Sequence, residues 1–304
     1  MVNYGGGPAL GWLRRQNQGP MAGVSTREVD WREVGLFVLI TFGLSWAVWV
    51  GMKPLFPQLV VRTFLAMFGP TFATIAVVRL RRRPLRRRWR LTRQRLVANF
   101  YASLLAILVI GVTMAVGFGL SLWTGDLRLP GSSGQDLFEV LPLPVALFTY
   151  WMTAFGEEYG WRGFLTPVLS PLGGARASIL TAVIFAAWHA PAILLDGFNF
   201  PNHHVLGMFD MLVFALPFSI VQAWLRSATG SVAAPTAAHA SVNALTGMLY
   251  AMTARSTSII AAPIGLLGTA PFAVLAVVLL LSGRLWRRIE PAAAPSAVAA
   301  RSSA

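Results

Sequence analysis

The residues of this chain that can do chemistry are few, and they gather in three short motifs. These are FGEEYGWRGF with Glu157, Glu158 and Arg162, FAAWHAP with Phe185 and His189, and HASVN with His239 and Asn243. A buried carboxylate that holds a water, with a histidine beside it, is a general-base arrangement. A histidine with an amide forms a donor pair suited to the oxyanion of a tetrahedral intermediate. The residue types therefore suggest amide hydrolysis by an activated water.

Spacing assigns a different task to each of these residues. Glu158 and Arg162 are i and i+4 on a helix, so we expect an ion pair between them. Glu157 points about 100° away from Glu158 and is free to face the interior of a bundle. Our hypothesis is that Glu157 and His189 activate the water, while Glu158 is structural. His239 and Asn243, also i and i+4, share a helix face and would hold the oxyanion.

The segments that must position these residues are apolar and long. Hydrophobic residues make up 56% of the 304 residues and charged residues only 12%, far below a soluble domain. Segments of about 20 residues are long enough to cross a bilayer. We expect eight of them, near residues 34–52, 59–79, 97–123, 140–162, 177–195, 205–225, 231–252 and 261–283. The predicted fold is all-α, a polytopic transmembrane helix bundle of about eight spans.

Composition also divides the chain into one domain with two tails. We expect a disordered N-terminus over 1–23, a transmembrane domain over 24–290 and a disordered tail over 291–304. Ser25 and Glu28 resemble a capping box, which predicts an interfacial helix through Trp31. The chain contains no cysteine, which excludes a thiol nucleophile, disulfides and Cys-ligated zinc.

The basic residues predict the orientation of the bundle in an inner (cell) membrane. The net charge is +14, and ten arginines lie within residues 79–95. Such a loop stays cytoplasmic, so eight spans place both termini in the cytoplasm, with 21 of the 25 basic residues on that side. The arginines can also contact anionic lipid head groups. We see no folded basic surface of the kind that binds nucleic acid.

The three motifs resemble those of the CPBP intramembrane protease family, the CAAX prenyl endopeptidase and bacteriocin-processing group. The family pattern is EExxxR, then FxxxH, then HxxxN or HxxxD, and the residues named above fill every position in order. The resemblance covers about residues 145–252. It implies a bundle of about eight helices with a cavity open to the cytoplasm, in which Glu157 and His189 activate water and His239 with Asn243 steadies the oxyanion.

Other readings of the same residues remain open. Members of the family have also been called metalloproteases, and Glu157, His189 and His239 would be the ligands if Zn²⁺ were bound. We favour a mechanism without a metal or other cofactor, because the sequence lacks HExxH. A catalytically silent binding or immunity protein and a transporter using the buried charges are the alternatives. The expected substrate is a peptide or membrane-protein tail, with or without a lipid.

Overall fold

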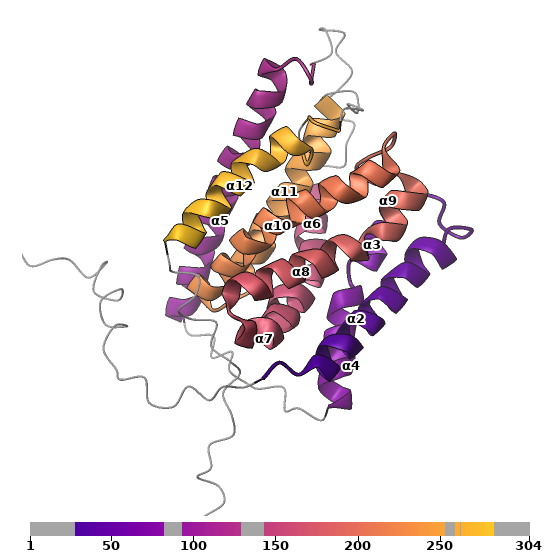
Figure 1. Ribbon diagram of the computed structural model, residues 1–304, viewed down its shortest axis with the longest axis vertical. Coiled ribbons are helices and arrows are strands. Elements are labelled where there is room, and N and C mark those ends of the chain that lie inside the picture. The colour runs from indigo at the N-terminus through magenta and orange to yellow at the C-terminus, as the bar shows by residue number, and fades with distance from the viewer. Residues whose placement is uncertain (1–27, 82–92, 129–142, 253–258, 262, 283–304) are drawn as a thin grey trace, which may run out of the picture.

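The chain forms a bundle of helices in a computed structural model (Figure 1). The described residues are 28–81, 93–128, 143–252, 259–261 and 263–282. In chain order the longer helices are α2 (Trp31–Trp46), α3 (Leu59–Ala66), α4 (Gly69–Leu80), α5 (Arg93–Trp123), α6 (Leu143–Gly160), α8 (Gly174–Trp188), α9 (Ala190–Asp196), α10 (His204–Thr229), α11 (Ala233–Met252) and α12 (Leu266–Leu281). These ranges contain no strand, so the predicted all-α fold is confirmed. Both predicted tails lie outside them.

Within the described residues, five helical stretches are long and apolar enough to cross a membrane. They are Trp31–Gly51, Leu59–Leu80, Leu96–Trp123, Gly174–Asp196 and His204–Thr229. Each coincides with a predicted span, and the shorter apolar helix α12 lies within a sixth. The other two predicted spans fall on α6 and α11, which are helical but, over the described residues, are not among the five. These two helices carry the carboxylates and the His–Asn pair, which lower their hydropathy.

The start of the first span differs from the expectation. Ser25 lies outside the described residues, and residues 28–30 are not helical. The helix begins instead at Trp31, where Asp30 caps it by accepting a hydrogen bond of 3.2 Å from the backbone N–H of Glu33. The prediction of a helix leading into Trp31 was therefore wrong, because Asp30 supplies the capping oxygen closer to the span.

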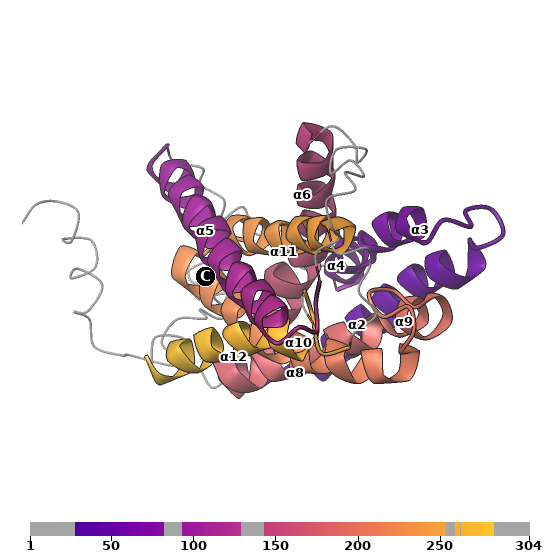
Figure 2. The ribbon, with the colours of Figure 1, turned by 90° about the horizontal axis from the view of Figure 1, so that it is seen from above.

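The packing of the bundle brings the three motifs together. α10 packs against α8 and α12, and α11 packs against α5 and α6, as the two views of the ribbon show (Figures 1 and 2). α4 packs between α2 and α6. A Cβ at Gly160, inside the first motif, would clash with Pro70 of α4. Glycine at this position therefore allows α6 to approach α4 closely.

Two helices change geometry where they carry motif residues. α6 continues into a π-helix, η2 (Trp161–Leu165), and such segments are frequent at functional sites. α8 ends at Trp188 and α9 begins at Ala190, so His189 lies at the junction. Pro191 cannot donate a backbone N–H, which favours a break in the helix here. The Trp188 carbonyl accepts a hydrogen bond of 3.0 Å from the Trp46 indole of α2.

Candidate active site

A cavity of about 500 Å³ lies inside the bundle, and polar residues from all three motifs line it. These are Glu157 of α6, His189 at the α8–α9 junction, and His239 with Asn243 of α11. Much of the remaining lining is apolar and comes from several elements, including Leu59, Phe64, Met67, Met211, Phe214 and Val242. The structure thus brings together the four residues that the sequence singled out, although the first, Glu157, and the last, Asn243, lie far apart in the chain.

Glu157 faces the cavity and is almost completely buried. Its Oε2 accepts a hydrogen bond of 3.2 Å from the indole Nε1 of Trp161, one helical turn later. Trp161 is itself fully buried and packs edge-on against Phe185 and Trp188. The indole therefore holds one carboxylate oxygen in place, and the other oxygen is left for a ligand.

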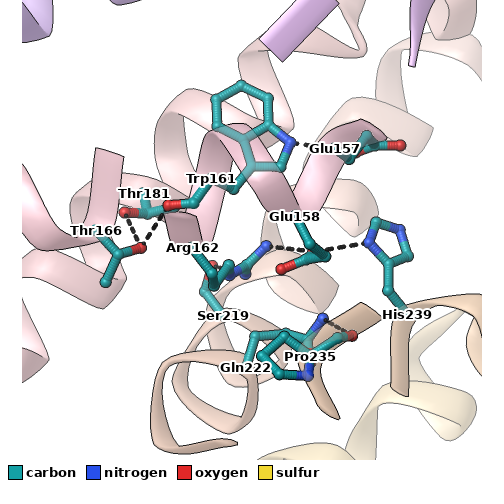
Figure 3. Close-up of polar contacts among 10 residues, drawn as sticks. All are labelled: Glu157, Glu158, Trp161, Arg162, Thr166, Thr181, Ser219, Gln222, Pro235 and His239. Carbon is teal, nitrogen blue, oxygen red and sulfur yellow. Dashed lines mark hydrogen bonds and ion pairs between the residues drawn. The ribbon is translucent and has the colours of Figure 1, made fainter. Parts of the chain in front are cut away.

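The side chain of Glu158 has different neighbours and connects α6 with α11 (Figure 3). Its Oε1 lies 2.9 Å from Nη1 of Arg162 and 2.7 Å from Nδ1 of His239. The predicted Glu158–Arg162 ion pair is confirmed. The contact with His239 was not predicted, because sequence spacing carries no information about which helix faces α6. Glu158 is not among the residues that line the cavity, so the two adjacent carboxylates do face different surroundings, as predicted.

Arg162 is fully buried, and several contacts hold it in place. Its Nη2 donates to Ser219 Oγ of α10 at 2.8 Å, and its own carbonyl accepts from Arg226 Nε at 3.1 Å. Removing one partner of a buried ion pair leaves an uncompensated charge. The Glu158–Arg162 pair therefore ties α6 and η2 to α10 and, through His239, to α11.

His189 is nearly buried among aromatic rings. Its ring centroid lies 4.7 Å from those of Phe185 and Trp188, and Phe198 stacks on it at 6.1 Å. Nδ1 lies 2.9 Å from the carbonyl oxygen of Phe185, which can only accept a hydrogen bond. The ring thus carries its proton on Nδ1 when neutral, and Nε2 is left with a free lone pair.

The candidate supporting residue Phe185 lies between the two histidines. Its ring centroid is 4.7 Å from His189 and 6.1 Å from His239. Phe218 of α10 packs edge-on against His239 from a centroid distance of 5.4 Å. These rings restrict both imidazoles and shield them from water, which strengthens electrostatic interactions inside the cavity.

The predicted zinc alternative finds no support in the arrangement of ligands. Among the described residues, no group of three or more His, Cys, Asp or Glu side chains is placed to hold a metal ion. Glu157, His189 and His239 line one cavity, but they do not form such a group. A mechanism that is independent of a metal stays a prediction.

Three residues that bind the site residues or their backbone were not predicted from the sequence. The indole of Trp161 binds Glu157, and the hydroxyl of Ser219 binds Arg162. The indole of Trp46 binds the carbonyl of Trp188, the residue before His189. Trp161 has a signal that was available, since it lies at i+4 from Glu157. Ser219 and Trp46 have none, because each is an ordinary residue of an apolar helix until the bundle forms.

The apolar helices that are long enough to cross a membrane make this chain a multi-pass membrane protein. Residues 139–245 match the model of the family described as Rce1-like, type II CAAX prenyl endopeptidase. The match contains all three motifs, and it confirms over this stretch the resemblance that the motifs indicated. A comparison with curated proteins gave no match.

Proposed function

We propose that the protein is an intramembrane endopeptidase that hydrolyses a peptide bond with a water activated by Glu157 and His189. The observation that carries this proposal is the common cavity, lined by a carboxylate, two imidazoles and an amide from three separate helical segments. Ionisable groups inside membrane proteins are costly and by default mark function. The family match supports a peptide as the substrate class.

The acid–base pair follows from the hydrogen bonds of the two residues. Trp161 occupies one oxygen of Glu157, and the other can accept a proton from water. Nε2 of His189 can accept the second water hydrogen and orient the water, because Nδ1 is bound to the Phe185 carbonyl. The water oxygen attacks the carbonyl carbon, Glu157 takes its proton, and the same proton passes to the leaving nitrogen as the C–N bond breaks.

The oxyanion is stabilised by the facing residues of α11. Glu158 binds Nδ1 of His239, which fixes the ring orientation and leaves Nε2 as the nitrogen available to a substrate. When the imidazole is protonated, both nitrogens donate, so Nε2–H can bind the oxyanion. The amide of Asn243, one turn later on the cavity wall, is the second donor. Glu158 and Arg162 support this arrangement without touching the substrate.

The proposal is tested with full-length protein in detergent and a quenched-fluorescence library of membrane peptides. Glu157→Gln removes the base while keeping the shape of the side chain, and the expected loss is about 10²–10⁴-fold in kcat. Glu28→Gln is the matched control, because Glu28 is exposed and outside the bundle. Cleavage by Glu157→Gln at the rate of the natural sequence would remove the catalytic assignment.

A second measurement separates the metal-free reaction from a zinc-dependent one. We expect cleavage to persist after exhaustive chelation, since Glu157 and His189 can activate the water by hydrogen bonding alone. Activity that disappears on chelation and returns when Zn²⁺ is added back would overturn the metal-free mechanism. The same preparation should be assayed with lipidated and unlipidated peptides, which decides whether the substrate carries a prenyl group.

The orientation in the membrane is also a proposal. The arginines of residues 79–95 support a cytoplasmic position for that loop and, with eight spans, for both termini. Because the chain has no cysteine, single cysteines report topology without further changes. A cysteine replacing Glu28 should be shielded from an impermeant thiol reagent in intact cells, and one replacing Asp126 should react. The reverse pattern would invert the topology.

A further inference from the structure

α6 and α11 lie side by side and antiparallel, and they meet at two levels. At the first level Glu158 contacts His239. At the second level, eight residues earlier on α6 and eight later on α11, the Tyr150 hydroxyl lies over the backbone of Gly247. Tyr150 and Gly247 both line the cavity that holds Glu157 and Asn243. The cavity therefore also has a polar group, the Tyr150 hydroxyl, two helical turns from the candidate catalytic residues.

The Tyr150 hydroxyl is free to bind a ligand. No hydrogen bond joins it to any residue of the described ranges, although its ring is half-buried. The ring is held edge-on by Phe64 of α3, with the centroids 6.3 Å apart. A Cβ at position 247 would lie 2.7 Å from the hydroxyl oxygen, so the hydroxyl occupies this place only because residue 247 is glycine. A fixed phenol without a partner is a ready hydrogen-bond donor.

The separation of the two polar groups corresponds to a short length of peptide. Tyr150 and Glu157 are seven residues apart on α6, which is about 10 Å along the helix axis at 1.5 Å per residue. An extended peptide advances about 3.3–3.6 Å per residue. A chain that runs along the cavity from the candidate catalytic residues thus reaches the Tyr150 hydroxyl after about three residues.

We propose that Tyr150 binds a peptide oxygen of the substrate, about three residues from the bond that is cleaved. The oxygen is either an internal carbonyl or a terminal carboxylate, and both accept a hydrogen bond from a phenol. This subsite rests on the proposed endopeptidase activity and adds to it a residue that selects which bond is cut. Gly247 serves the subsite by leaving room for the hydroxyl.

The test uses full-length protein and a peptide cleaved in the library assay, with KM and kcat determined separately. Tyr150→Phe keeps the ring and its contact with Phe64 but removes the donor. We expect KM to rise about 3–10-fold, the range of one hydrogen bond, with kcat within about twofold. Gly247→Ala should reproduce the rise, because the new methyl group displaces the hydroxyl. Tyr159→Phe is the control, since Tyr159 is half-buried on the same helix but does not line the cavity.

Shortened and modified peptides locate the oxygen. A peptide with fewer than three residues on the side that reaches Tyr150 should bind the natural protein and Tyr150→Phe equally well. A peptide whose C-terminal carboxylate is replaced by a carboxamide is then assayed with the natural protein. If this change raises KM as much as Tyr150→Phe does, the oxygen that Tyr150 binds belongs to the carboxylate. If it does not, the oxygen is an internal carbonyl of the peptide. An unchanged KM in Tyr150→Phe, in a preparation where Glu157→Gln abolishes cleavage, overturns the subsite alone. Retained cleavage by Glu157→Gln overturns the proposed function.

Discussion

Nδ1 of His239 lies 2.7 Å from Oε1 of Glu158, although the two residues are 81 positions apart in the chain. The same carboxylate oxygen lies 2.9 Å from Arg162, so one buried anion holds a cation of its own helix and an imidazole of α11. The two adjacent carboxylates of the first motif thus have separate surroundings. One is bound within the protein, and the other faces a cavity.

Substitution of Glu158 is expected to affect stability more than that of Glu157. Glu158→Gln leaves the buried guanidinium of Arg162 without its counter-charge, which typically costs about 3–5 kcal/mol. Glu157→Gln removes no ion pair and retains an oxygen that can accept from Trp161. Thermal unfolding in detergent, followed by intrinsic tryptophan fluorescence, should show a lower Tm for Glu158→Gln only. Equal midpoints for both variants would contradict the structural assignment of Glu158.

The role of His189 as an acceptor at Nε2 can be separated from its role as a donor at Nδ1. Glutamine places an amide oxygen close to the position of Nε2, whereas asparagine reaches only the position of Nδ1. Loss of a general acid–base group typically costs about 10²–10⁴-fold in rate. We expect His189→Gln to retain more activity than His189→Asn in steady-state cleavage assays. Higher activity in the asparagine variant would mean that the Nδ1 contact with Phe185 is the more important one.

Trp46 is expected to position His189 indirectly, through the carbonyl of Trp188. Its indole N–H binds the carbonyl of Trp188 at the helix break, and Trp46→Phe removes this bond while keeping an aromatic ring. The loss of one hydrogen bond should lower kcat about 2–10-fold with little change in KM, because the imidazole is less well positioned. Trp31→Phe is the control, since Trp31 is exposed at the start of the same helix. An equal decrease in kcat for Trp31→Phe would contradict the prediction.

Asn243 is expected to contribute to the transition state rather than to binding. Removal of one oxyanion donor typically lowers kcat about 10²–10³-fold. Asn243→Ala should therefore lower kcat by this amount with KM almost unchanged. Ser241→Ala, two residues earlier on α11, is the control because its hydroxyl binds the carbonyl of Ala237 and Ser241 does not line the cavity. An increase in KM alone would place Asn243 in ground-state binding.

The sequence by itself determined the helical membrane class and the candidate residues. Apolar length predicts spans without reference to a partner, because a bilayer requires each segment to satisfy its own backbone. The i, i+4 spacing likewise predicts the Glu158–Arg162 pair, since both residues lie on one helix. The start of the first span was missed although its signal is local, since Asp30 caps the helix by accepting a hydrogen bond from the backbone N–H of Glu33, three residues later.

Contacts between helices were decided only by the tertiary structure. Nothing in the spacing of α6 and α11 indicates that Glu158 meets His239, or that Tyr150 lies over Gly247. These pairs depend on the register of two antiparallel helices, which packing of the whole bundle selects. The break at His189 is similar, since Pro191 permits it locally but the indole of Trp46 comes from a helix more than a hundred residues away. Periodicity describes one helix at a time, whereas a cavity is a property of several.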